Sequence, residues 1–175
     1  MSIKRILPLL ALLLSLAACG FTMRGTTPLP FDTLYVGVPD NTLFGAQLRR
    51  AIRAASPGTR LVTEPNKADA RLQQIQRSQA QREVSLDPNG RVEEYELSVF
   101  YIFRLTDKAG QPLIPDITLS ASQDMPYSDE IVQAKEGEMT LLYRSLEESL
   151  IGRLINRLTA PDVKAAAQAA REAQD

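Results

Sequence analysis

The chain has no histidine and one cysteine among its 175 residues. Without histidine it cannot form a histidine-ligated metal site or use a histidine as a general base. No glycine-rich phosphate-binding loop follows an expected strand, and no metal-ligand spacing is present. A basic excess is also missing, because 20 Lys and Arg side chains are balanced by 21 Asp and Glu. We therefore expect no cofactor, no metal and no nucleic-acid partner.

The same absences argue against catalysis. A serine hydrolase of the usual kind needs a Ser–His pair, which this chain cannot form. Glu93, Glu94 and Glu96 are close in sequence, but Glu93 points away from the other two on an expected strand. An exposed strand face explains them more simply than a catalytic carboxylate pair. We predict that the chain is not an enzyme.

The chain begins with a segment that resembles a secretory signal peptide. Lys4 and Arg5 precede an apolar run over residues 6–18, which is shorter than the roughly 20 residues of a transmembrane helix. The run ends in Leu16-Ala17-Ala18-Cys19, which resembles a bacterial lipobox. We therefore predict that residues 1–18 are a lipoprotein signal peptide and that Cys19 becomes the acylated N-terminus.

Two further observations concern the lipidation site. Cys19 has no disulfide partner in the oxidising compartment that a signal peptide implies, so acylation is a better explanation than a buried structural thiol. Gly20 follows it in place of Asp, and by resemblance to the usual sorting rule this favours the outer membrane over the inner one. We expect a soluble body tethered to the periplasmic side of the outer membrane.

The remaining 157 residues suit one domain with a sizeable core. They carry 18 basic and 21 acidic side chains, a net charge of about −3. Glycine and proline break regular structure after the cysteine, so residues 19–32 are an expected lipidated leader. We expect a single α/β domain over 33–160 and a flexible Ala- and Gln-rich tail over 161–175.

The domain opens with a strand, a helix and a second strand. Alternating apolar residues predict a strand over 33–38, and helical spacing predicts a helix over 43–55 that Asn41 or Thr42 caps. A short strand over 60–63 follows, which suggests a parallel crossover. Arg49, Arg50 and Arg53 lie off the apolar line of the helix. They can form an anion site, although a solvated helix face is the simpler interpretation.

Three antiparallel strands are expected next, over 70–86, 92–105 and 113–122. The first is rich in Gln and Arg, and a bulge is expected near Leu72 and Ile75, where the period of two breaks. Asn89-Gly90 predicts a tight hairpin turn. The second strand alternates apolar side chains, Tyr95 to Leu105, with a more polar opposite face. The sheet therefore has one dry and one largely wet face.

A long C-terminal helix supplies the cover for the dry face. It is expected to begin at Ser128 or Asp129 and to end at about Leu158. Its apolar stripe has spacings of three and four and consists of Met139, Leu142, Tyr143, Leu146, Leu150, Leu154 and Leu158. The predicted fold class is α+β: a βαβ unit, a β-meander and a C-terminal helix, with two helices on one face of a mixed, mostly antiparallel sheet.

The segment Cys19-Gly20-Phe21-Thr22-Met23-Arg24-Gly25 resembles the Cys-Gly-Phe-x-Leu-Arg-Gly opening of the LPS-assembly lipoprotein family, LptE. Met23 stands where Leu is usual. The similarity continues at Asn89-Gly90, Glu94-Tyr95 and Ala134-Lys135, and the order of elements agrees. The resemblance therefore covers nearly the whole chain after residue 18.

The resemblance implies an outer-membrane lipoprotein that plugs the lumen of a large β-barrel, LptD, and supports its assembly. The two proteins together would place lipopolysaccharide in the outer leaflet. Large barrels have a polar lumen, and the Gln- and Arg-rich strand over 71–83 has the character of a surface that faces one. An ordinary solvated strand would look the same in sequence.

The resemblance also implies lipopolysaccharide binding by basic residues at the first hairpin and at the start of the last helix. Lys135 agrees with the helix position. The hairpin position is Pro88, which carries no charge, so Arg91 or Arg82 would have to take its place. A periplasm-facing lipoprotein that regulates a cell-wall synthase is the alternative. It would need a long flexible leader, whereas roughly a dozen residues precede the first expected strand.

Overall fold

The computed structural model of the chain describes residues 27–127 and 132–173. Cys19 and the segment 19–25 that carries the family resemblance lie outside these residues. The first half of the domain consists of β1 (Thr33–Gly37), α2 (Leu43–Ala55), β2 (Arg60–Val62) and a 3-10 turn, η1 (Pro65–Lys67). The second half consists of β3 (Ala70–Leu86), β4 (Val92–Asp107), β5 (Ile117–Pro126), α3 (Val132–Leu158) and α4 (Pro161–Glu172). Within the described part, no helix is both long and apolar enough for a membrane span.

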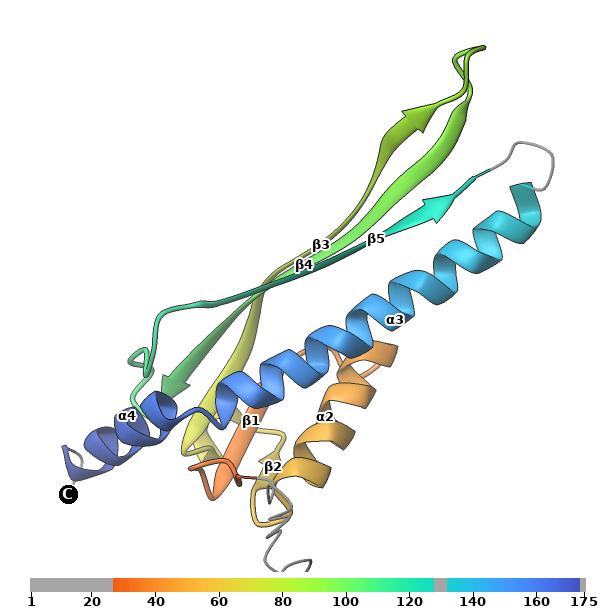
Figure 1. Cartoon of the computed structure of the whole chain (residues 1–175). Helices are drawn as coiled ribbons and strands as arrows, with labels where there is room; N and C mark the ends of the chain where they lie inside the picture. Colours follow the sequence, from red (N-terminus) through yellow and green to blue (C-terminus); the bar gives the residue numbers. More distant parts are fainter. Residues whose placement is uncertain (1–26, 128–131, 174–175) are drawn as a thin grey trace, which may run out of the picture.

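The five strands form one sheet in the order β2-β1-β3-β4-β5. β1 pairs in parallel with both β2 and β3, whereas β3, β4 and β5 form an antiparallel meander. Figure 1 shows α3 running along the meander, with α2 beside its C-terminal half and the β3–β4 hairpin extending past its N-terminal end. The predicted α+β class, with its mixed and mostly antiparallel sheet, is confirmed.

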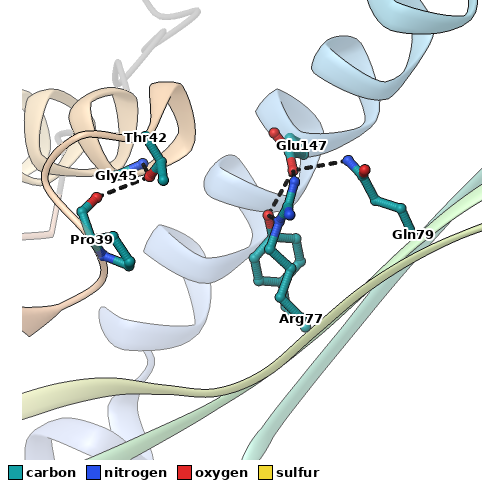
Figure 2. Close-up of polar contacts among 7 residues, drawn as sticks. Pro39, Thr42, Gly45, Arg77, Gln79 and Glu147 are labelled. Atoms are coloured by element: carbon teal, nitrogen blue, oxygen red, sulfur yellow. Dashed lines mark hydrogen bonds and ion pairs between the residues drawn. The ribbon is translucent and has the colours of Figure 1, made fainter.

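The β1–α2–β2 unit forms where capping and helical spacing predict it. The Thr42 hydroxyl oxygen accepts a hydrogen bond from the backbone N–H of Gly45 at 3.1 Å and caps the helix. Figure 2 shows this cap beside Pro39. A Cβ at position 45 would lie 2.3 Å from the Pro39 carbonyl oxygen, so the tight turn before α2 requires glycine there. Phe44, Leu48 and Ile52 are buried on the inner side of α2.

The β3–β4 hairpin confirms the predicted bulge and turn. The register shifts between Gln74 and Gln76, which makes Ile75 the extra residue. At the turn, Gly90 has a φ of 82°, in the region that glycine adopts without strain. The Asp87 carboxylate accepts hydrogen bonds from the backbone N–H groups of Arg91 at 2.9 Å and Asn89 at 2.8 Å. These bonds, that from Arg91 foremost, lower the pKa of Asp87 to about 2.

The core lies between the meander and the helices. On β4 the buried side chains are Leu97, Val99, Tyr101, Phe103 and Leu105, and α3 covers them with Leu146, Leu150, Leu154 and Leu158. Phe44 of α2 stacks on Tyr101 with ring centroids 4.5 Å apart. The predicted apolar stripe of the long helix is therefore a core stripe along its C-terminal half, while Met139, Leu142 and Tyr143 are partly buried against it.

Besides shifts of a few residues at other strand ends, the structure differs from the prediction in three places. β5 begins at Ile117, because Pro112 and Pro115 lack the N–H groups that would extend its ladder toward residue 113. Residues 27–32 of the predicted leader form no helix or strand, as predicted, but Leu29 and Phe31 are buried and belong to the core of the domain. The predicted flexible tail is, over 161–172, the helix α4.

Helix α4 is stabilised by its local sequence and by contacts with the rest of the domain. Pro161 occupies its first turn, where the missing N–H removes no hydrogen bond, and the alanines that follow have the highest helix propensity. Val163 and Ala167 are buried. The Arg157 guanidinium donates two hydrogen bonds to Asp162, at 2.8 and 2.7 Å, and ties α4 to the end of α3. The helix therefore belongs to the folded domain.

Candidate functional site

Arg82, Arg91 and Lys135, the three basic residues predicted to contact lipopolysaccharide, lie at one end of the molecule. We call this the distal end and define it by residues 82–96, 124–127 and 135–138. It combines the β3–β4 hairpin, the C-terminal end of β5 and the start of α3, and it is the upper right of Figure 1. The structure thus places the three predicted residues at a common end of the sheet.

Each of the three cations has an acidic partner close in sequence or across the strand pair. Lys135 Nζ lies 2.8 Å from Glu138, and the Lys135 side chain is only 14% exposed. Arg91 Nε lies 3.0 Å from Asp87 in the hairpin turn. Arg82 Nη2 lies 3.1 Å from Glu96 on β4. Within the described residues, no hydrogen bond or ion pair joins any two of the three cations.

The sheet separates Arg82 from Lys135. Arg82 pairs in register with Glu96, and Glu96 points to the side of β4 opposite that of its buried neighbour Leu97. Because α3 packs over the Leu97 side, Arg82 lies on the open face and Lys135 belongs to the helix on the covered face. The three residues therefore share an end of the molecule but do not form a single basic surface.

The distal end is acidic overall. Its three cations are accompanied by eight carboxylates: Glu83, Asp87, Glu93, Glu94, Glu96, Asp124, Glu136 and Glu138. An anionic ligand that contacts Lys135 must therefore replace a carboxylate that already neutralises it.

The distal half of β3 is exposed on both of its faces. Every residue from Ile75 to Val84 is exposed, and most of these side chains are Gln, Arg or Ser. Helix α3 contacts β5 and β4 more than β3, and it reaches this half of the strand through polar side chains such as Tyr143, whose hydroxyl donates to the carbonyl oxygen of Ala80 at 2.9 Å. The strand that the sequence singles out as unusually polar is thus a surface strand, backed by β4 on one edge.

A buried polar cluster joins α3 to the sheet. Glu147 on α3 accepts hydrogen bonds from the Tyr101 hydroxyl at 2.7 Å and from Arg77 Nη2 at 2.9 Å, both at Oε1. Gln79 Nε2 lies 3.4 Å from the same oxygen, and Arg77 Nε also donates to the Tyr101 hydroxyl at 2.8 Å. Figure 2 shows Arg77 and Gln79 converging on Glu147 from β3.

The electrostatics of this cluster follow from burial and pairing. The Glu147 side chain is 9% exposed, whereas that of Arg77 is 46% exposed. The hydrogen bond to Glu147 raises the pKa of Arg77, and burial raises the pKa of the Tyr101 hydroxyl well above its usual range. The cluster therefore holds a charged Arg–Glu pair and a neutral tyrosine. We see no arrangement for proton transfer here, and no group of His, Cys, Asp and Glu in the described residues could hold a metal ion.

Sequence comparison decides the family. The family model LptE, described as lipopolysaccharide-assembly, matches residues 31–158. The chain belongs to the LptE family. The match includes every described strand, α2 and α3, and it ends where α3 ends. The resemblance that rests on Cys19–Gly25 is therefore supported by a match to a different part of the chain.

Solved structures of similar proteins agree with the LptE fold. A solution structure of lipoprotein B from Nitrosomonas europaea is 28% identical, with a TM-score of 0.65. The match covers 81% of this chain and 91% of the Nitrosomonas chain. A crystal structure of rare lipoprotein B from Shewanella oneidensis is 22% identical, with a TM-score of 0.65. The match covers 76% of this chain and 98% of the Shewanella chain. A crystal structure of a minor lipoprotein from Acinetobacter baumannii is 20% identical, with a TM-score of 0.61. The match covers 75% of this chain and 93% of the Acinetobacter chain. A comparison with curated proteins found no match.

Sequence analysis missed the polar cluster of this LptE protein, although a signal for it exists. Glu147 stands at helical spacing between Tyr143 and Leu150, within the apolar stripe of α3. An acid in a buried stripe needs a cationic or hydrogen-bonding partner, and the Arg-rich strand over 71–83 is one source of such a partner. Which arginine meets it depends on the strand register, which the bulge at Ile75 shifts.

Proposed function

We propose that this LptE-family protein is a non-catalytic outer-membrane lipoprotein that plugs the LptD β-barrel, supports its assembly and binds lipopolysaccharide during insertion into the outer leaflet. The family match over residues 31–158 is the observation that carries the proposal. The family's description, lipopolysaccharide-assembly, gives the process, and the barrel partner comes from the resemblance of the N-terminal segment.

The surface of the meander supports a place inside a polar lumen. A protein that sits in a large barrel is surrounded by polar side chains and water, so its own surface needs many hydrogen-bonding groups and few apolar patches. Most side chains of the exposed half of β3 meet this requirement, and Ile75 and Val84 are the exposed apolar residues on it. On the open face of β4 and β5, Ser98, Ser120 and Ser122 continue the same polar character.

The anchor is part of the proposal. We propose acylation of Cys19 after removal of residues 1–18, with the domain on the periplasmic side or within the barrel. Leu29 is the first buried core residue in the described chain. Ten residue steps separate it from Cys19, which limits the reach of the leader to about 35 Å even when fully extended. That limit keeps the domain close to its own membrane and disfavours a regulator that acts across the periplasm.

Affinity purification from membranes tests this function. The full-length protein, carrying a C-terminal tag, is extracted in a non-ionic detergent from cells that produce it. We expect a large outer-membrane β-barrel to copurify at a one-to-one ratio. In the Cys19→Ala variant we expect the folded domain to lose its own membrane association in cells that lack the barrel, because the acyl chains are gone.

Two results would contradict the proposal. Recovery of a cell-wall synthase in place of a barrel would support the alternative class. Unchanged fractionation of Cys19→Ala with the outer membrane in barrel-free cells would show that acylation is not the anchor.

For the ligand we propose that Lys135 contacts a phosphate of lipopolysaccharide, with Arg91 and Arg82 as further contacts at the distal end. Binding exchanges the Glu138 carboxylate on Lys135 for a phosphate, which carries more negative charge and three acceptor oxygens. The agreement of Lys135 with the family pattern supports this assignment. Arg91 in the hairpin turn lies at the same end, whereas Arg82 would contact the ligand from the open face of the sheet.

We expect Lys135→Asp to weaken binding of purified lipopolysaccharide by the full-length protein at least tenfold, because a charge-assisted hydrogen bond becomes a repulsion. Binding is measured by titration in non-ionic detergent at fixed salt. Lys164→Asp is the matched control, since Lys164 is an exposed lysine on α4, away from the distal end. Circular dichroism should show the same fold in both variants. Equal affinity of the two variants would remove Lys135 from the site.

A further inference from the structure

A groove lies beside α2, at the opposite end of the fold from the β3–β4 hairpin. Its volume is about 810 Å3, and its walls come from α2 and from the C-terminal ends of β1 and β2. This volume is within the range of about 300–1,000 Å3 that is usual for ligand sites. Arg49, Arg50 and Arg53 all line it, so we call it the arginine groove.

Arg49 is a fixed part of the arginine groove. Its Nη2 donates to the carbonyl oxygens of Val36 at 2.9 Å and Val38 at 2.6 Å, and its Nη1 donates to that of Gly45 at 3.1 Å. It also forms an ion pair with Asp40. The guanidinium therefore ties the end of β1 to α2, and Asp40 offsets its charge.

Arg50 and Arg53 are different, because both are exposed and neither has an ion pair or side-chain hydrogen bond within the described residues. They stand three positions apart on α2, a spacing that places two side chains next to each other on one helix face. Two neighbouring cations without a partner destabilise a helix slightly. Asp40, the acid among the groove-lining residues, is already paired with Arg49. The groove therefore carries an uncompensated charge of about +2.

The other lining residues indicate what kind of anion fits. Tyr35 and Thr63, which carry hydroxyl groups, line the groove, as do the apolar residues Leu61 and Val62 at the end of β2. Guanidinium groups match the oxygens of a phosphate with two parallel hydrogen bonds each. Hydroxyl-bearing and apolar residues beside the arginines suit a sugar ring attached to that phosphate. A phosphorylated sugar therefore uses every part of the groove.

We propose that the arginine groove binds a phosphorylated sugar of lipopolysaccharide through Arg50 and Arg53. The proposal rests on the proposed function for the source of the ligand, and it adds a site separate from the distal end. The charges favour this site: the groove has two cations without partners, whereas each distal cation is already neutralised.

Binding by the full-length protein in non-ionic detergent tests the site. The variant Arg50→Gln/Arg53→Gln is compared with Arg144→Gln/Lys164→Gln, which also removes two exposed cations that have no side-chain partner in the described chain. Three probes are used: purified lipopolysaccharide, the same material after chemical removal of its phosphates, and vesicles of phosphatidylethanolamine with phosphatidylglycerol. Thermal unfolding confirms that both variants fold.

We expect the groove variant to bind lipopolysaccharide about tenfold more weakly than the wild type, and the control variant to bind within twofold of it. We expect the wild type to bind the dephosphorylated material at least as weakly as the groove variant binds intact lipopolysaccharide, and to bind the vesicles weakly. Equal binding by the groove variant and the wild type would overturn the site. Vesicle binding that is as strong as lipopolysaccharide binding, and is lost in the groove variant, would overturn the ligand and indicate a phospholipid headgroup.

Copurification separates a failure of this inference from a failure of the proposed function. We expect the groove variant to retain the barrel partner, since neither arginine contributes to the core. A wild-type protein that recovers a barrel while lipopolysaccharide binding is insensitive to Arg50 and Arg53 would refute the groove alone. A protein that loses lipopolysaccharide binding in the groove variant but never recovers a barrel would refute the plug role and leave the groove.

Discussion

Leu150→Ala is expected to lower the free energy of unfolding by about 2–5 kcal/mol. Leu150 is fully buried on α3, and it belongs to the stripe that packs this helix onto β4 and β5. Truncation removes its contacts and leaves a cavity that the packed neighbours fill only in part. Urea denaturation of the full-length protein, followed by circular dichroism, measures the loss as a lower transition midpoint.

The matched control is Leu141→Ala on the same helix. The Leu141 side chain is 63% exposed, so we expect its truncation to change stability by less than about 0.5 kcal/mol. The comparison separates the effect of burial from any change in helix propensity, because both substitutions exchange Leu for Ala in α3. Equal transition midpoints for the two variants would mean that the stripe does not face the core.

The elements that the sequence predicts most closely have strong local signals at both ends. Thr42 and Ser56-Pro57-Gly58 bracket α2, and the observed helix, Leu43–Ala55, has the predicted bounds. β3 also has its predicted bounds, because a turn precedes it and Asp87-Pro88-Asn89-Gly90 follows it. In each case the residues that end the element lie next to it in the sequence, so its bounds do not depend on contacts with distant parts of the chain.

α4 has weaker signals at its ends: Pro161 is in its first turn, but its N-cap residue, Ala160, has no side chain that can cap the helix. Only Val163 and Ala167 are buried in it, and two small side chains produce no visible apolar stripe against a background of alanine. Its position depends instead on tertiary contacts. Arg171 donates a hydrogen bond to the carbonyl oxygen of Pro30 at 2.6 Å, across 141 positions of sequence. The sequence predicts no regular structure on either side of this contact, in the leader because of its glycines and prolines and in the tail because of its Ala- and Gln-rich composition.

The candidate site shows a similar limit. The sequence names Arg82, Arg91 and Lys135 through a family pattern, and the shared end of the sheet follows from strand lengths. Their acidic partners do not follow in the same way. Arg82 meets Glu96 because the register of β3 and β4 places these positions opposite each other, in the same register as Leu86 and Val92 beside the turn. Charge pairing across strands is therefore a product of register, and it changes which cations are available to an anion.

The second large effect is expected at the polar cluster between α3 and the sheet. Glu147 is the shared acceptor for Tyr101 and Arg77, and those two residues come from different strands of the meander. Removal of this carboxylate leaves the buried Tyr101 hydroxyl without its acceptor and Arg77 without its counter-charge. Loss of one partner of a fully buried pair costs about 3–5 kcal/mol. Arg77 is nearly half exposed, so water compensates part of its loss.

We therefore expect Glu147→Ala to lower the free energy of unfolding by about 2–3 kcal/mol, and Glu147→Gln to lower it less, because an amide oxygen still accepts the Tyr101 proton. Glu148→Ala is the matched control. Its carboxylate accepts a hydrogen bond from Gln47 at an exposed position, and its removal should cost less than about 0.5 kcal/mol. Urea denaturation of the three full-length variants ranks them. If Glu147→Ala is as stable as Glu148→Ala, the cluster does not hold α3 on the sheet, and apolar packing alone fixes the helix.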